Sequence, residues 1–184
     1  MVEIKIAGRG GQGAVLASQI LAEGLFYQGL AVQSFPSFGA ERRGAPVAAF
    51  VRVDKREITL RCAVKRPDWL ILMDPNLISN PMVMAGVDES TIVLVNALTA
   101  APIGNLAGNR VFTVNATAIA GRMGLVTASF PIVNTAMVGA FAAASGLLEL
   151  AAISRVVAAN APIKKEENVD AAREAFDAVT EVSS

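Results

Sequence analysis

The sequence predicts an α/β domain of three layers, in which a mostly parallel sheet with one antiparallel hairpin is covered by helices on both faces. Two observations predict this class. A β-branched run over 2–7 is followed directly by a glycine-rich turn and then by an apolar pattern of helical period. Three continuous apolar stretches come later, at 69–73, 91–95 and 110–114, and each suits a strand buried on both faces. A length of 184 residues favours a single domain over 1–184.

The first quarter of the chain contains a strand, a turn, a helix and a second strand. Residues 14–27 carry apolar side chains at helical spacing, and Gly29 follows as a C-terminal cap. Residues 31–35 are the next strand, so the order predicts a βαβ unit with a right-handed crossover. With glycines at the first turn, this unit is typical of a Rossmann-like domain.

The antiparallel hairpin is expected after a loop over 36–46 that is rich in Gly, Pro and charge. Two short strands, 47–53 and 57–60, flank residues 54–56 (Asp-Lys-Arg), which suit a tight turn.

Beyond residue 115 the pattern is helical. The stretch 131–148 is apolar all round, which indicates a helix buried on every side, and Asn168 is expected to cap the last helix. Helices are predicted over 116–123, 131–148, 149–159 and 168–179. Residues 123–148 carry no formal charge and could span a bilayer by length, but Pro131 and Asn134 favour a buried helix, so no membrane partner is expected.

Composition excludes several classes of function. Sixteen basic and sixteen acidic residues cancel, so no global field attracts nucleic acid. The chain has no His, and Cys62, its single cysteine, can form neither an internal disulfide nor a metal cluster by itself. Charged residues make up only 17%, against 53% hydrophobic, which indicates that some apolar surface is buried against other chains. The first residues do not resemble a signal peptide, so we expect a cytoplasmic protein.

The glycine turn, Gly8-Arg9-Gly10-Gly11-Gln12-Gly13, satisfies the dinucleotide pattern G-x-G-x-x-G between a strand and a helix. Such a turn lets a phosphate approach the free N–H groups of the helix N-terminus. Binding of NAD also needs an acidic residue at the end of the second strand, and 32–36 contains none. The alternative, that these glycines only allow close packing of helix and sheet, stays open.

A second group of residues follows the second strand: Phe35-Pro36-Ser37-Phe38-Gly39-Ala40-Glu41-Arg42-Arg43-Gly44-Ala45-Pro46. We expect it at the same edge of the sheet as the glycine turn. Two adjacent arginines beside glycines suit bidentate bonds to phosphate or carboxylate. A solvated loop with an internal ion pair from Glu41 is the alternative.

Both segments together resemble the gamma subunit, or gamma-type domain, of pyruvate and other 2-oxoacid:ferredoxin oxidoreductases. The matching residues are Gly8–Gly13, Phe35–Gly39, Glu41–Gly44 with Pro46, and Asn134-Thr135 followed by Gly139-Ala140. The resemblance extends from residue 3 to about residue 176.

The resemblance implies a complex that decarboxylates pyruvate, 2-oxoglutarate or a related 2-oxoacid oxidatively, forms an acyl-CoA and reduces ferredoxin. It implies thiamine diphosphate, Mg, iron–sulfur clusters and coenzyme A in the complex, with none held by this chain alone. It implies partner subunits of alpha, beta (thiamine diphosphate) and delta (ferredoxin-like) type.

The resemblance also implies which residues form a site that faces a cofactor or a partner subunit. No residue is expected to be a catalytic acid, base or nucleophile, or a metal ligand. Two alternatives are an independent Rossmann-type nucleotide-binding protein and a purely structural assembly subunit. The site residues are Gly8, Arg9, Gly10, Gly11, Gln12, Gly13, Glu41, Arg42, Arg43, Gly44, Asn134 and Thr135.

Overall fold

A computed structural model describes residues 1–37, 45–98, 106–128 and 130–182. The polypeptide forms one mixed sheet with the strand order β2-β3-β1-β4-β5-β6-β7. Strands β1, β4, β5 and β6 are parallel neighbours, while β3 and β7 run antiparallel to the strands beside them. The described strands are β1 (Val2–Arg9), β2 (Ala31–Pro36), β3 (Pro46–Asp54), β4 (Trp69–Leu72), β5 (Ile92–Asn96), β6 (Val111–Val114) and β7 (Thr180–Val182).

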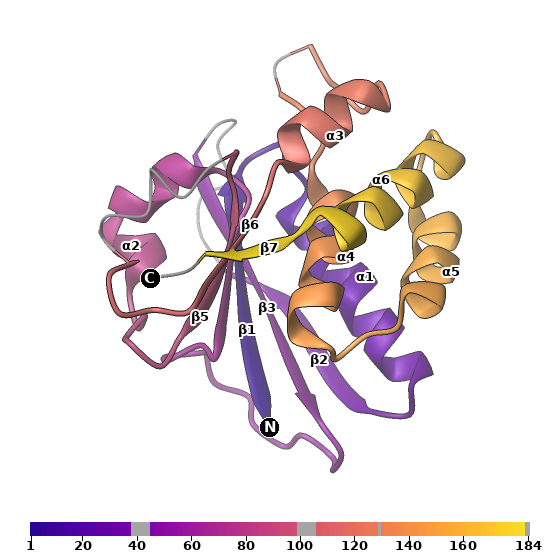
Figure 1. Cartoon of the computed structure of the whole chain (residues 1–184). Helices are drawn as coiled ribbons and strands as arrows, with labels where there is room; N and C mark the ends of the chain where they lie inside the picture. The colour runs from indigo at the N-terminus through magenta and orange to yellow at the C-terminus, as the bar shows by residue number, and fades with distance from the viewer. Residues whose placement is uncertain (38–44, 99–105, 129, 183–184) are drawn as a thin grey trace.

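Helices cover the two faces of the sheet unequally (Figure 1). On one face lie α1 (Ala14–Tyr27), α4 (Asn134–Ser145), α5 (Leu150–Asn160) and α6 (Lys165–Ala178), with α3 (Ala116–Arg122) beside α6. Of the helices formed by described residues, the other face carries only the 3₁₀ helix η1 (Pro75–Ser79) and α2 (Pro81–Met84). The three-layer α/β class is therefore confirmed, with one thick and one thin helical layer.

Two apolar cores match these layers. The larger joins alternate residues of the strands, such as Ile4 and Val51, to α1 and α4, whose Phe141 is fully buried. The smaller lies under η1 and α2 and includes Leu70 and Val93. Helix α4 is buried along nearly its whole length, as its uniformly apolar sequence predicts.

The antiparallel component differs from the predicted hairpin. Residues 57–60 form no strand, so the expected pairing with 47–53 was wrong. Strand β3 instead lies between β1 and β2 and pairs antiparallel with both. Strands β1 and β2 are thus not neighbours, as they would be in a simple βαβ unit. Strand β3 takes the position beside β1 and pairs with it over eight residues.

Helix boundaries also shifted. The chain over 131–133 leads into α4 without being helical, and α6 begins at Lys165 rather than at Asn168. Asn168 is therefore no cap but a buried residue of the helix. In the part of the chain that the structure describes, no helix is long and apolar enough to cross a membrane.

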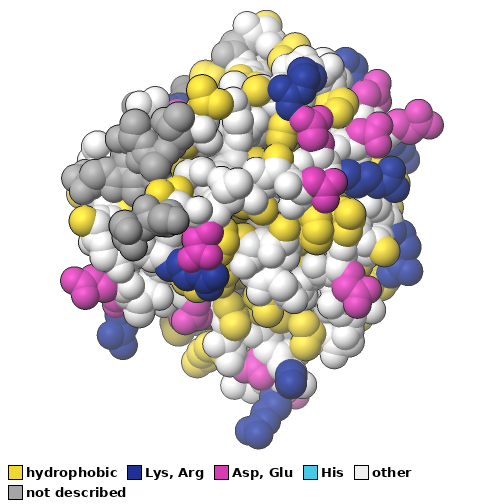
Figure 2. All heavy atoms as spheres, viewed as in Figure 1, with side chains coloured by type: hydrophobic (Ala, Val, Ile, Leu, Met, Phe, Trp, Pro, Cys, Tyr) yellow, Lys and Arg dark blue, Asp and Glu magenta, His cyan; other side chains and the backbone are white. Residues whose placement is uncertain are grey.

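The molecular surface is unevenly charged. In Figure 2, acidic side chains gather at the upper right, where Figure 1 places α6, whereas apolar and uncharged atoms dominate the centre of this face.

Candidate functional site

The glycine turn lies between β1 and α1, at the carboxyl end of the parallel strands. Gly13 precedes the helix with φ of 85°, and a Cβ there would lie 2.6 Å from Asn134 Nδ2. Gly11 has φ of 104°. Both positions need glycine for their backbone conformation, and Gly13 needs it also because α4 approaches so closely. The close approach at Gly13 is to α4 and not between α1 and the sheet, so the alternative of helix–sheet packing stays open.

The side chain of Gln12 forms a hydrogen bond inside the glycine turn. Its Oε1 accepts a hydrogen bond of 2.7 Å from the N–H of Arg9, while its own N–H donates to Arg9 O at 3.0 Å. The side chain is only 6% exposed. These bonds fix the loop in one shape before any ligand arrives, which lowers the entropy that binding would cost.

Arg9 is held along the edge of the sheet by Asp74, at the end of β4. The Arg9 Nε to Asp74 Oδ2 distance is 2.5 Å. The other oxygen of Asp74 accepts from Asn76 N at 2.9 Å and so caps η1. The ion pair joins the glycine turn to the neighbouring strand, and it directs the Arg9 side chain toward β4.

The Glu41-Arg42-Arg43-Gly44 segment lies outside the described residues. Its flanks are described: Ala45 lies beside the glycine turn, and Ser37, which follows β2, lies against β3. Gly10 N donates to Ala45 O at 2.9 Å, and Ser37 N donates to Ala48 O at 2.8 Å. Both described flanks therefore lie at the carboxyl-end edge of the sheet, and the position of the loop between them stays a prediction.

Asn134 and Thr135 begin α4 and are 2% and 1% exposed. Thr135 Oγ1 donates to Asn168 Oδ1 at 2.9 Å, and the amide nitrogen of Asn168 donates to the carbonyl oxygens of Ile163 and Lys164. This buried chain of bonds joins α4 to the start of α6. The geometry thus gives the Thr135 hydroxyl a structural contact, and contact of Thr135 with a ligand stays a prediction.

Asn134 differs from its neighbour because one end of its amide lacks a partner. Oδ1 accepts from Thr135 N at 2.9 Å, whereas Nδ2, which faces Gly13, makes no hydrogen bond to any described residue. The first turn of α1, directly after Gly13, leaves N–H groups without intrahelical partners and contains no acidic residue. An amide donor, free backbone donors and the positive end of a helix dipole therefore converge at this point.

This arrangement suits an anion or a carbonyl oxygen, but it does not suit NAD. The insertion of β3 between β1 and β2 moves the end of β2 away from the glycine turn, and β2 carries no acidic residue to bind a ribose. Among the described residues, no group of three His, Cys, Asp or Glu side chains could hold a metal ion.

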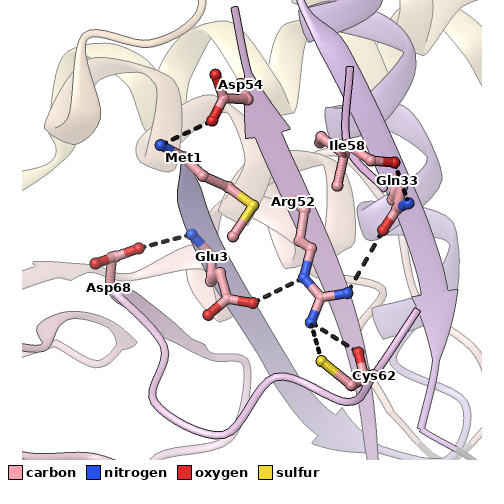
Figure 3. A network of polar contacts seen from close by, with 8 residues as sticks. All are labelled: Met1, Glu3, Gln33, Arg52, Asp54, Ile58, Cys62 and Asp68. Atoms are coloured by element: carbon pink, nitrogen blue, oxygen red, sulfur yellow. Dashed lines mark hydrogen bonds and ion pairs between the residues drawn. The ribbon is translucent and has the colours of Figure 1, made fainter. Parts of the chain in front are cut away.

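Sequence reasoning missed the polar network around Arg52, on the face of the sheet away from α1. Arg52 Nε donates to Glu3 Oε1 at 2.7 Å, and Nη2 donates to Cys62 O at 2.7 Å (Figure 3). A charged residue inside the apolar run 47–53 was the available signal, because a buried arginine needs a partner.

Comparisons with known proteins agree over nearly the whole chain. Residues 3–178 match the family described as pyruvate ferredoxin/flavodoxin oxidoreductase. The chain is 44% identical over 158 residues to pyruvate synthase subunit PorC of Methanocaldococcus jannaschii, which covers 85% of this chain and 84% of that protein. It is 42% identical over 188 residues to the pyruvate/ketoisovalerate oxidoreductases common subunit gamma of Pyrococcus abyssi, with 96% of each covered.

A solved structure repeats the fold. Pyruvate oxidoreductase subunit PORC of Thermotoga maritima superimposes with a TM-score of 0.82 at 33% identity, covering 99% of this chain and 98% of that one.

Proposed function

This chain belongs to the pyruvate ferredoxin/flavodoxin oxidoreductase family, and on that premise we propose that it is the gamma subunit of a multi-subunit 2-oxoacid:ferredoxin oxidoreductase. The complex decarboxylates a 2-oxoacid oxidatively, transfers the acyl group to coenzyme A and reduces ferredoxin. The observation that carries the proposal is the agreement in both sequence and fold, over almost the full length of each chain, with relatives named as such subunits.

The chain works through partners, because its own side chains do not suit the iron–sulfur clusters and the acid–base chemistry of the reaction. An iron–sulfur cluster is held by about four ligands, chiefly thiolates, and the sequence has one cysteine. It also has no histidine to act as a general base. We therefore assign thiamine diphosphate, its Mg and the clusters to subunits of alpha, beta and delta type, and the redox steps to those subunits.

Other subunits also determine which 2-oxoacid the complex uses. The Pyrococcus abyssi relative is named as common to pyruvate and ketoisovalerate oxidoreductases. A subunit shared by two such enzymes does not distinguish their substrates, and we carry this inference to the present chain.

Coenzyme A is the cofactor that the glycine-turn edge fits. The first turn of α1 and Asn134 Nδ2 would bind one of its anionic groups, with Arg42 and Arg43 on the adjoining loop. When bound, coenzyme A supplies the thiol that accepts the acyl group. The competing role for this edge is contact with the thiamine-bearing subunits.

The substitution Asn134→Asp separates these two roles. It keeps the oxygen that accepts from Thr135 N and replaces the free donor by a negative charge. If an anion of coenzyme A binds there, the KM for coenzyme A rises about tenfold or more in an intact complex, through one lost charge-assisted bond and added repulsion. If the edge contacts a subunit, the yield of complex falls and the KM in surviving complexes is unchanged.

The proposal as a whole is tested by tagging the chain in its native host and isolating it without oxygen. We expect a thiamine diphosphate subunit and a cluster-bearing subunit to accompany it, with coenzyme A-dependent reduction of ferredoxin on a 2-oxoacid. A chain that is isolated alone and binds a dinucleotide would contradict the proposal.

A further inference from the structure

The face of the sheet opposite α1 is crossed by a segment that is neither helix nor strand. Residues 55–66, which we call the basic strap, follow β3 and run to the start of β4 without regular structure. The strap is anchored to the strands by hydrogen bonds. Gln33 Nε2 donates to Ile58 O at 3.0 Å, and Arg52 Nη2 donates to Cys62 O at 2.7 Å (Figure 3). Its path is therefore built into the fold.

The strap concentrates positive charge in a chain that is neutral overall. It holds five of the sixteen basic residues and a single acidic one, Glu57. All five basic residues are exposed, and no salt bridge between described residues uses a side chain of the strap. The basic residues are Lys55, Arg56, Arg61, Lys65 and Arg66.

Between the strap and the sheet edge lies a groove of about 780 Å³. Its walls include the aromatic rings of Phe35 and Phe50, whose centroids are 5.5 Å apart, and Leu60, which is 44% exposed. One wall is β2, the outermost strand on this side, whose outer edge pairs with no described strand. The groove thus combines apolar side chains and an open strand edge with Arg61, the one basic residue of the strap among its described lining residues, while the other four basic residues lie farther along the strap.

The groove suits an acidic polypeptide better than a small anion. A phosphate site needs donors that converge on one point. Here the buried guanidinium of Arg52 is already bonded to Glu3, Gln33 and the strap, and the free charges are spread along twelve residues. Distributed charge around an apolar floor is the pattern of a protein interface, where the rim steers association and the apolar centre holds it.

A second copy of this chain is the less suitable occupant. Its acidic segment, 165–182, holds six acidic residues against two basic ones. Three of the six are already in ion pairs: Asp170 with Arg173, Glu174 with Arg122, and Glu181 with Arg110.

We propose that the groove and the basic strap are a docking surface for an acidic segment of another subunit of the oxidoreductase complex, with an apolar side chain seated against Phe35 and Phe50. This inference rests on the proposed function, since it takes the occupant from the same complex. Arg52 positions the surface by holding the strap to the sheet.

The test compares two triple substitutions in the complete complex, expressed with all its subunits. Arg56→Glu, Arg61→Glu and Lys65→Glu reverse the strap, while Glu166→Lys, Glu167→Lys and Asp177→Lys reverse the same number of acidic residues on α6 as a matched control. Circular dichroism of each isolated variant checks folding. We expect strap reversal to lower the recovery of complex about tenfold or more near 150 mM salt, because rim charges set association, and the α6 control to change it little.

Cys62 provides a second, independent measurement, because it is the single cysteine, is exposed and lines the groove. A thiol-directed photocrosslinker attached at Cys62 before assembly should capture an acidic peptide of another subunit. In the isolated chain, millimolar coenzyme A should leave the rate of thiol labelling unchanged.

The possible outcomes distinguish failure of the docking proposal from failure of the proposed function. Normal assembly of the strap-reversed chain, protection of Cys62 by coenzyme A, or a crosslink to α6 of a second copy would each overturn the docking proposal while the wild-type complex stays intact. A wild-type chain that is isolated without any other subunit would instead overturn the proposed function, and this inference with it.

Discussion

Strands β1 and β3 present opposite chemistry on their two faces. Ile4 and Val51 are fully buried in the large apolar core under α1 and α4. Their neighbours in sequence, Glu3 and Arg52, turn to the other face and are held there by charge and hydrogen bonds, although Arg52 is only 1% exposed. On the face under α1 and α4 these strands pack by apolar burial. On the other face, beside the smaller core under η1 and α2, Glu3 and Arg52 form a polar network that holds the basic strap.

The contrast indicates that the two faces of the sheet have different roles. Apolar burial is non-directional and supplies most of the stability, whereas a buried charged network needs every partner in place. We therefore expect the helix-covered face to act as scaffold and the strap face, with the adjoining glycine-turn edge, to contact cofactor and partners. Four substitutions test this contrast, and the most damaging comes first.

Gly139→Ala should be the most damaging change, on the scaffold side. A Cβ at Gly139 would lie 2.0 Å from the carbonyl oxygen of Ala172, so α4 and α6 would have to separate. We expect a loss of more than about 3 kcal/mol in the free energy of unfolding, measured by chemical denaturation of the isolated chain. Gly121→Ala is the matched control in α3, where nothing lies within 4 Å of the added atom, and it should leave stability unchanged or slightly raised.

Arg52→Met should be nearly as costly, on the strap side. It removes the partner of Glu3, whose side chain is 20% exposed, and frees the Cys62 carbonyl. The expected loss is about 3 kcal/mol, because an unpaired charge is left in a largely buried place. Glu3→Gln, which keeps an acceptor for Arg52, should cost much less. A loss below about 1 kcal/mol for Arg52→Met would show that the strap face does not depend on the network.

Thr135→Val tests the polar bond inside the scaffold. The substitution keeps the shape of the side chain but leaves Asn168 Oδ1 without its hydroxyl donor. We expect a loss of about 1–2 kcal/mol, visible as a lower denaturation midpoint. The KM for coenzyme A in the assembled complex should not change, in contrast to Asn134→Asp. A raised KM would assign Thr135 to the ligand site instead.

The smallest effect is expected from Lys5, on the strap side of β1. Burial lowers the pKa of Lys5, and among the described residues its ammonium donates only to the carbonyl oxygens of Met82 and Ala85. Because the folded chain binds this proton less tightly than the unfolded chain, the cost of burying the charge is present below the folded pKa. That cost fades as the pH rises toward the unfolded value of about 10.4.

Wild type should therefore gain stability relative to Lys5→Met between neutral and alkaline pH, as measured by denaturation of both proteins at matched pH values. A difference that stays constant with pH would mean that folding does not perturb the pKa of Lys5.

Much of the scaffold could be predicted from the sequence, because local patterns determine it. Helix α1 spans the predicted 14–27, and the continuous apolar runs became the buried strands β4, β5 and β6. The position of β3 could not be predicted, since 47–53 alternates apolar and polar residues only weakly and one of its two partners, β1, is separated from it in sequence by α1 and β2. The strand expected over 57–60 did not form. The side chain of Gln33 donates to Ile58 O in this segment, and Arg52 donates to Cys62 O just beyond it.

The candidate site shows the same limit. The glycine turn and its place before α1 followed from spacing, but the contact between Gly13 and Asn134 joins residues more than a hundred positions apart. The resemblance to the family assigned these two segments to one site, which local sequence patterns could not do. The Glu41–Gly44 loop lies outside the described residues, so its role stays a prediction.

The most direct test of the central claim is an add-back measurement. The other subunits of the complex are expressed without this chain, and coenzyme A-dependent reduction of ferredoxin is measured anaerobically before and after the purified chain is added. The account predicts little or no activity before addition, recovery in proportion to the chain added, and no activity of the chain alone. Full activity without the chain, or ferredoxin reduction by the isolated chain, would contradict it.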